Sequence, residues 1–295
     1  MEKKRGIFLN EDGCLRTTPQ ILIVAFTFLL ISMVGQSLVT TVLFGLTNAG
    51  VLPAGITESY FWSGLIPETV LNFLAGGMIL VWYKVLNKKK IETMGVPSIL
   101  KNLKYVGLGM LVIILALAGV TAILLLVGDV KFTGLEFPAS IWQYFLLMSS
   151  VSFVEEVLNR GYIQHLVRSR SSLFWSCVIP SFVFMLFHLK NPGVPIIGFV
   201  NIFLAGMFFS ILTYKVGNIW FGFGAHMIWN AGAACIFGLM SMSSVTGSIL
   251  NFEYTRSTFF NGQAATPLNG LIATIMWLIL IVIFGCIFPR KRAYL

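Results

Sequence analysis

The sequence predicts an all-α membrane protein, a bundle of about eight transmembrane helices. Three observations support this fold class: 57% of the 295 residues are hydrophobic, 11% are charged, and the mean hydropathy is +0.87. This composition is too apolar for a soluble domain of this length. A backbone in hydrocarbon must satisfy its own hydrogen bonds, and the apolar runs are too long for barrel strands, so we expect helices.

Eight apolar runs have about the length that a spanning helix requires, roughly 20 residues. They lie at 21–46, 67–85, 105–127, 141–162, 173–189, 196–214, 219–239 and 268–288. We interpret residues 1–295 as a single integral membrane domain. The first run is too long for a signal peptide and no small-residue cleavage site follows it, so we expect a retained span. The polar stretch at 241–267 is expected to be an external loop.

The basic residues are distributed unequally between the two ends of these runs. With a cytoplasmic N-terminus, 16 of the 20 lysines and arginines fall at cytoplasmic ends, three fall outside, and Arg160 lies within a run. The positive-inside rule then places both termini in the cytoplasm. The net charge of +9 is therefore mainly a topology signal. No loop is large enough to form a basic nucleic-acid surface, so no nucleic-acid partner is expected.

Two adjacent acids and an arginine interrupt the fourth apolar run: Glu155, Glu156 and Arg160. A charge at the bilayer centre costs roughly 2.5–3.5 kcal/mol, so three charges this close together require a compensating role. Glu156 and Arg160 are spaced i, i+4 and are predicted to pair on one helix face. Glu155 points about 100° away from Glu156, which leaves it as the free carboxylate.

Two of the three histidines lie in later apolar runs, each one helical turn from another candidate side chain. His188 follows Phe184, and His226 precedes Asn230. Hydrogen bonds between helices would explain either histidine alone. Together with an unpaired glutamate, they form a functional-site hypothesis, because intramembrane ionisable residues usually mark function.

The turn at residues 168–171 relates the depth of Glu155 to that of His188. Glu155 lies about 15 residues before this turn and His188 about 18 after it, so antiparallel helices rising about 1.5 Å per residue bring both to a similar height. We therefore expect these two side chains to face each other. Residues 191–193, Asn-Pro-Gly, end the fifth run soon after His188, so a site nearer the outer face stays an alternative.

Three short motifs occur in order on three separate apolar runs: Glu155-Glu156-x-x-x-Arg160, Phe184-x-x-x-His188 and His226-x-x-x-Asn230. In these motifs the chain resembles the type II CAAX prenyl endopeptidases and their bacterial relatives, often called CAAX proteases and bacteriocin-processing enzymes. The resemblance covers residues 141–239, about a third of the chain, and we interpret this part as the catalytic core helices. It implies an intramembrane, glutamate-type peptidase.

The resemblance also implies a role for each motif residue. Glu155 and His188 would activate a water molecule for attack on a peptide carbonyl. His226 and Asn230 would form the oxyanion hole, and donors fixed in a low-dielectric site can stabilise a developing oxyanion. The supporting residues would be Glu156, Arg160 and Phe184.

Metal dependence is left open at this point. The His-Glu-x-x-His zinc motif is absent, and Glu155, His188 and His226 would have to converge from three helices to bind zinc. Metal-free catalysis without a cofactor is therefore preferred, and zinc at these three side chains is the alternative.

Two functions other than catalysis are weighed against the peptidase. A proton-coupled transporter would also carry Glu and His in its spans, but transporters usually show repeats or matched broken helices, and neither is evident. A non-catalytic immunity or partner-binding protein would be expected to lose a motif residue, and all are present. We predict a peptidase whose partners are the lipid bilayer and a membrane-associated peptide or protein substrate; no oligomeric state is predicted.

The absence of targeting elements favours the plasma membrane of a bacterium as the location. By analogy with the family, the reaction would serve bacteriocin maturation, immunity or signalling-peptide processing.

Overall fold

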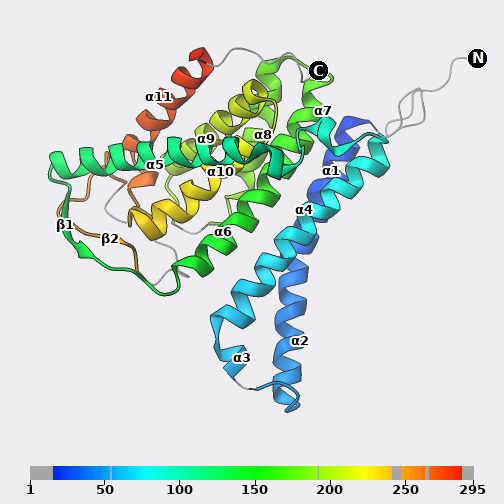
Figure 1. Ribbon diagram of the computed structural model, residues 1–295, viewed down its shortest axis with the longest axis horizontal. Helices are drawn as coiled ribbons and strands as arrows, with labels where there is room; N and C mark the ends of the chain where they lie inside the picture. The colour runs from blue at the N-terminus through cyan, green and yellow to red at the C-terminus, as the bar shows by residue number, and fades with distance from the viewer. Residues whose placement is uncertain (1–15, 54, 192, 241–246, 263–265, 288–295) are drawn as a thin grey trace, which may run out of the picture.

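Long helices form wherever the sequence is continuously apolar, and each of the eight predicted runs coincides with a helical segment. The computed structural model describes residues 16–53, 55–191, 193–240, 247–262 and 266–287 (Figure 1). The ends of the chain and parts of the predicted 241–267 loop lie outside these described residues. The prediction that both termini are cytoplasmic therefore concerns residues outside them.

The helices are named in chain order, and several continue through short π-helical or 3-10 segments. The main ones are α1 (Thr17–Leu29), α2 (Gln36–Asn48), α3 (Gly55–Glu58), α4 (Ile66–Asn87), α5 (Leu103–Leu126), α6 (Ile141–Glu156), α7 (Gln164–Arg168), α8 (Leu173–Phe187), α9 (Ile196–Val216), α10 (Trp220–Met227) and α11 (Leu271–Ile287). Two π-helices matter for the site: η5 (Val157–Ile163) joins α6 to α7, and η6 (Ile228–Ile236) continues α10.

A mostly helical membrane protein is confirmed, whereas the number of spans stays a prediction. Among the described residues, four helical stretches are long and apolar enough to cross a membrane: Thr17–Asn48, Phe61–Asn87, Ile91–Leu126 and Ile196–Val216. Leu173–Phe187 and Leu271–Cys286 are shorter apolar helices. The predicted run at 141–162 is helical, but two acids and an arginine make it less apolar than the others.

A small sheet departs from the all-α prediction. Strands β1 (Val130–Leu135) and β2 (Leu250–Tyr254) pair antiparallel, and the register is irregular between Phe132 and Gly134. The strand β2 lies within the stretch that was predicted to be an external loop. Phe132 and Phe252 face each other across the pair with ring centroids 5.9 Å apart. Aromatic pairs of this kind stabilise strands, but each strand is too short for its alternation to stand out in the sequence.

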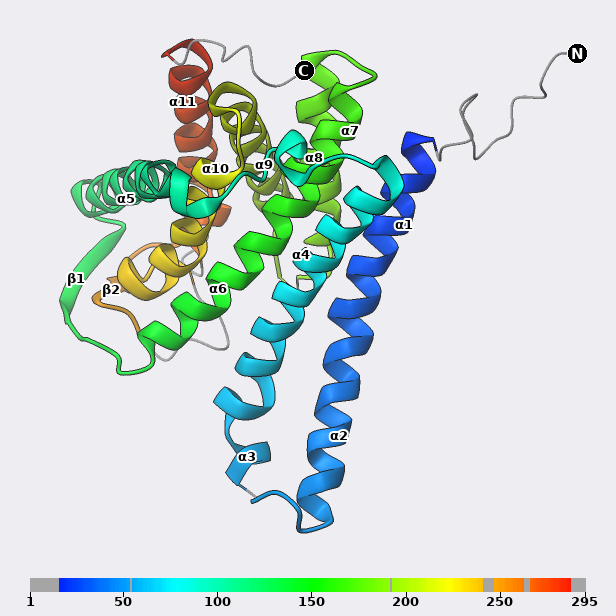
Figure 2. The ribbon, with the colours of Figure 1, turned by 45° about the vertical axis from the view of Figure 1, so that its right-hand side comes forward.

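The helices form a packed body with a protruding arm (Figures 1 and 2). Within the body, α8 packs on α9, α9 on α11, and α10 on both α5 and α6. The arm consists of α2 and α3 with the adjoining end of α4, and α2 has no buried residue. The arm exposes large apolar side chains, among them Leu38, Val42 and Phe44, as expected for helices that face lipid.

Two glycines let α5 and α10 approach closely. A Cβ atom added at Gly109 would meet the backbone oxygen of Phe221, and one added at Gly224 would meet the backbone oxygen of Val106. Small residues at a crossing allow two membrane helices to come into backbone contact. This crossing fixes the position of α10, which carries His226.

Candidate active site

The first motif lies where the regular helix α6 ends and the π-helix η5 begins. Glu155 and Glu156 are the last two residues of α6, and Arg160 lies in η5. π-Helical turns are rare and occur frequently at functional sites. The Glu155 side chain is 15% exposed, whereas those of Glu156 and Arg160 are fully buried. Of the two acids, Glu155 is therefore the one that a ligand can reach.

The predicted ion pair between Glu156 and Arg160 is confirmed. Arg160 Nη1 donates to Glu156 Oε1 at 2.9 Å, and Arg160 Nη2 donates to the backbone oxygen of Gly206 on α9 at 3.2 Å. The guanidinium also lies 4.6 Å from the ring centroid of Phe184 and 5.2 Å from that of Phe209. A buried cation needs such partners, because desolvation is costly without them. Arg160 thus ties η5 to α8 and α9.

His226 lies between the two acids, a position that the sequence did not predict. Its Nδ1 donates to Glu156 Oε1 at 3.0 Å, and its Nε2 is 3.5 Å from Glu155 Oε2. The imidazole is 2% exposed and stacks on the Phe209 ring with centroids 5.0 Å apart. Glu156 therefore holds the ring in one orientation, and Phe209 supports its face.

His188 makes its hydrogen bond within its own helix end, and its facing of Glu155 stays a prediction. Among the described residues, no hydrogen bond or ion pair joins the two, and His188 Nδ1 instead donates to the backbone oxygen of Phe184 at 2.8 Å. The helix α8 ends at Phe187, so His188 sits at its end. The register estimate assumed regular α-helices, but the chain between Glu155 and the turn contains the wider π-helix η5.

Phe184 connects the two histidines. Its ring centroid lies 4.6 Å from that of His188 and 5.5 Å from that of His226. It is buried and also lies under Arg160. Phe184 of the second motif therefore contacts Arg160 of the first motif and His226 of the third.

Asn230 lies in η6, after the end of α10, and is half-buried. Within the described part of the chain, its side chain forms no hydrogen bond. The spacing of four residues from His226 predicted a shared helix face, but a π-turn is wider than an α-turn and shifts this alignment. Asn230 follows His226 in the same continuous helical segment, and no hydrogen bond joins it to either acid within the described residues.

Several buried polar atoms of the first motif have no hydrogen-bond partner among the described residues: Glu155 Oε2, Glu156 Oε2, Asn159 Oδ1 and Arg160 Nε. Leaving such an atom unpaired costs about 1–3 kcal/mol. A cluster of them marks a place where a water molecule or a substrate would regain the missing bonds.

The family resemblance expected from the three motifs was tested by comparing the chain with models of known protein families. Residues 137–232 match the family model of type II CAAX prenyl endopeptidase Rce1-like proteins. The predicted family resemblance is confirmed. The matched CAAX endopeptidase segment makes up about a third of the chain and contains all three motifs. A search of the curated proteins gave no match, and a search of the solved structures gave none either.

Two further residues of the matched segment lie against the motif residues. Phe209 contacts both His226 and Arg160, but one phenylalanine among 26 gives no signal in the sequence. Gly222 lies against the acid pair, because a Cβ atom there would be 2.8 Å from Glu156 Oε2. The Gly-Phe-Gly sequence before His226 predicts such a close approach, since glycine lets a helix pack tightly against its neighbour.

The zinc alternative requires three side chains in one place. Within the described residues, no group of three His, Cys, Asp or Glu side chains is arranged to hold a metal ion. Glu155 and His226 lie together, but His188 is directed to the backbone of α8. The residues as placed do not form the predicted three-ligand set, so we derive no step through a metal.

Proposed function

We propose that this protein is an intramembrane peptidase that hydrolyses a peptide bond in a membrane-associated peptide or protein. One observation supports the proposal above all: the imidazole of His226 lies between a partly exposed acid, Glu155, and a buried acid, Glu156. Glu155 is partly exposed, and Glu156 with Arg160 holds His226 beside it. The Rce1-like match over the same helices supports peptide hydrolysis as the reaction.

In the proposed reaction, Glu155 acts as a general base on a water molecule. The Glu155 carboxylate takes one proton from the water as the water oxygen bonds to the peptide carbonyl carbon, and the carbonyl oxygen becomes an oxyanion. When the tetrahedral intermediate collapses, the carbon–nitrogen bond breaks. Glu155 then returns its proton to the leaving amine, which leaves the carboxylate ready for another cycle.

The two histidines and Asn230 take complementary roles in this proposal. His226, held by the Nδ1 bond to Glu156, directs Nε2 toward Glu155 and is proposed as a donor to the developing oxyanion. Asn230 is proposed as a second oxyanion donor, and His188 as a second partner of the water. The last two assignments rest on the family resemblance.

The membrane setting completes the proposal. We place 141–239 as catalytic core helices within one integral membrane domain, with both termini on the cytoplasmic side of a bacterial plasma membrane. The charge distribution of the sequence supports this orientation. Reporter fusions after Leu295 and near Gly262 test it, and an external C-terminus would reverse the orientation. Processing of bacteriocins, immunity or signalling peptides is the proposed biological use.

The decisive experiment compares Glu155→Gln with the parent protein. Purified protein is incubated with membrane-associated peptides, with and without a chelator, and the products are identified by mass spectrometry. Glu155→Gln keeps the side-chain volume but removes the base, so cleavage should be abolished while the folded yield stays the same. Glu253→Gln, in strand β2, is the matched control. Full cleavage by Glu155→Gln would refute this assignment.

A further inference from the structure

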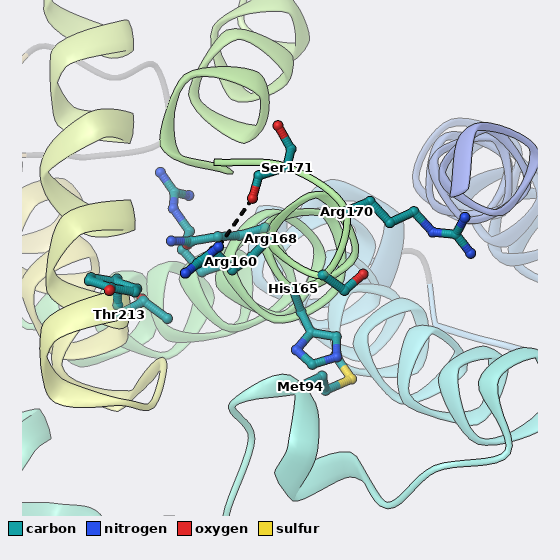
Figure 3. Close-up of a pocket in the computed structure, with 10 residues that line it drawn as sticks. Met94, Arg160, His165, Arg168, Arg170, Ser171 and Thr213 are labelled. Atoms are coloured by element: carbon teal, nitrogen blue, oxygen red, sulfur yellow. Dashed lines mark hydrogen bonds between the residues drawn. The ribbon is translucent and has the colours of Figure 1, made fainter. Parts of the chain in front are cut away.

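A pocket of about 570 Å³ lies at the basic end of the core helices, beside the acid pair. It is formed by η5, α7 and α9, the turn at Arg168–Ser171, and Met94. Figure 3 shows Arg160, Arg168 and Thr213 on one side of it, whereas Arg170 extends away from them. The three motifs do not account for this pocket, because Arg160 is the only motif residue among those that line it.

Four of the residues that line the pocket carry a buried polar atom without a hydrogen-bond partner in the described residues. These atoms are Arg160 Nε, Gln164 Oε1, Arg168 Nε and Thr213 Oγ1. Three of them can donate a hydrogen bond, and two belong to guanidinium groups. Native proteins rarely leave buried polar atoms unpaired, so their concentration around one cavity indicates a polar ligand.

Arg168 supplies the uncompensated positive charge of the pocket. Its Nη1 donates to the backbone oxygen of Ser171 at 3.1 Å, and its guanidinium lies 5.9 Å from the ring centroid of Tyr214. Among the described residues, no acid pairs with Arg168, whereas the charge of Arg160 is balanced by Glu156. The ligand is therefore expected to be an anion.

His165 lines the same pocket but adds no charge at neutral pH. Burial, and then the nearby Lys89, lower the pKa of His165 to about 4. Its Nε2 shares a hydrogen bond of 3.1 Å with the Tyr83 hydroxyl. The selectivity for an anion therefore depends on the arginines.

The surroundings of the pocket favour a membrane lipid as the source of the anion. Phe174 and Trp175 begin α8 just after the turn that lines the pocket, and both are exposed. Exposed aromatic side chains of this kind are typical of the membrane–water interface. Basic pockets between helices at that level bind anionic lipid headgroups.

We propose that this pocket binds the phosphate group of an anionic phospholipid headgroup, with the Arg168 guanidinium and the Thr213 hydroxyl as donors. Guanidinium groups are well suited to phosphate because their planar donors match its oxygens. Free phosphate offers the same chemistry from solution. Binding here does not depend on the peptidase proposal, although Arg160 would connect an occupied pocket directly to Glu156.

The test is thermal unfolding of the purified protein in phosphatidylcholine nanodiscs, with phosphatidylglycerol titrated in place of phosphatidylcholine. A ligand that binds only the folded protein raises the unfolding temperature, so we expect a saturable rise. Arg168→Gln should weaken the apparent affinity by at least about tenfold, because it removes charge-assisted bonds. Lys101→Gln removes one exposed positive charge from Ile99–Asn102, outside the pocket lining, and should leave the affinity unchanged.

Thr213→Val provides a second variant that keeps the charge and the shape. Without lipid, Thr213→Val should fold at least as well as the parent. It should nevertheless bind phosphatidylglycerol more weakly. If Arg168→Gln fails to fold, this variant tests whether the pocket binds the lipid. An equal loss of affinity in Arg168→Gln and Lys101→Gln would reveal general attraction of the lipid to a charged surface and overturn the proposal. So would the absence of any rise with phosphatidylglycerol.

Inorganic phosphate, added to protein in pure phosphatidylcholine nanodiscs, distinguishes the two sources. A rise in unfolding temperature that depends on Arg168 would assign the site to free phosphate. No rise with inorganic phosphate, together with a rise with phosphatidylglycerol, supports the lipid headgroup.

Discussion

His226 Nδ1 lies 3.0 Å from Glu156 Oε1, although 70 residues separate the two along the chain. Both side chains are buried, so the contact is not screened by solvent. Glu156 accepts bonds from Arg160 and His226 through the same oxygen. The orientation of the imidazole beside Glu155 therefore depends on a carboxylate that the solvent does not reach.

Replacing Arg160 tests the buried ion pair. Arg160→Ala leaves Glu156 buried without its cation, and breaking a buried pair in this way typically costs about 3–5 kcal/mol of unfolding free energy. Chemical denaturation in detergent measures the loss. The matched control is Arg170→Ala, because Arg170 is exposed and forms no ion pair within the described residues; surface substitutions of this kind usually change stability by less than about 0.5 kcal/mol. Equal stability of Arg160→Ala and the parent would show that the pair is not structural.

The two histidines should differ in how they affect the acid pair. His226→Ala removes a partner of Glu156 and the support of Phe209, so both kcat and the unfolding temperature should fall. A single oxyanion donor is worth about 10²–10³ in rate, with KM little changed, because it acts mainly in the transition state. Steady-state kinetics and thermal unfolding measure the two effects.

His188→Ala should lower kcat and leave the unfolding temperature near that of the parent, since its ring bonds only the backbone of its own helix end. Full activity in His188→Ala would remove this residue from the reaction.

Gly222→Ala tests the close approach of α10 to the acids. The added Cβ would lie 2.8 Å from Glu156 Oε2, so the carboxylate must move away and His226 loses its alignment. Cleavage should fall by at least about tenfold, as small displacements in an active site commonly cost this much or more. Gly107→Ala is the control, because a Cβ there meets nothing within 4 Å, and alanine favours an open helix position by about 0.5–1 kcal/mol. Equal activity in both variants would contradict the geometry.

Acid should destabilise the protein partly through His165. The pKa of His165 in the folded protein is about 4, below the ordinary value of 6.5. Between these values the unfolded chain binds a proton that the folded protein does not, so this contribution to stability falls as the pH drops from 6.5 toward 4. The unfolding temperature of the parent should therefore fall more from pH 7 to pH 5 than that of His165→Gln. Parallel losses in the two proteins would show that His165 does not titrate in this way.

The positions of the helices and the Glu156–Arg160 pair could be predicted because both depend on local spacing. Continuous apolar residues indicate helices, and i, i+4 spacing brings opposite charges together on one face. The sheet of β1 and β2 could not be predicted, because its strands are 115 or more residues apart and each is too short to show a clear pattern.

The arrangement around His226 could not be predicted for a different reason. Its contact with both acids depends on how α10 crosses α6, and its stacking on Phe209 depends on α9. Spacing within one helix carries no information on these angles. The expectation that Glu155 and His188 lie at one height assumed uniform helices, whereas η5 intervenes and α8 ends before His188, so the spacing alone does not fix how the two side chains lie.

The π-helices η5 and η6 make the site sensitive to changes in chain length. A π-turn can be regarded as an α-helix with one extra residue inserted, and each residue of an α-helix rotates its successors by about 100°. Deleting one residue from η5 would restore a regular helix and turn everything beyond it, including Gln164 and Arg168, to another face. A single-residue deletion in η5 would therefore separate the acids from the pocket that Arg160 and Arg168 line.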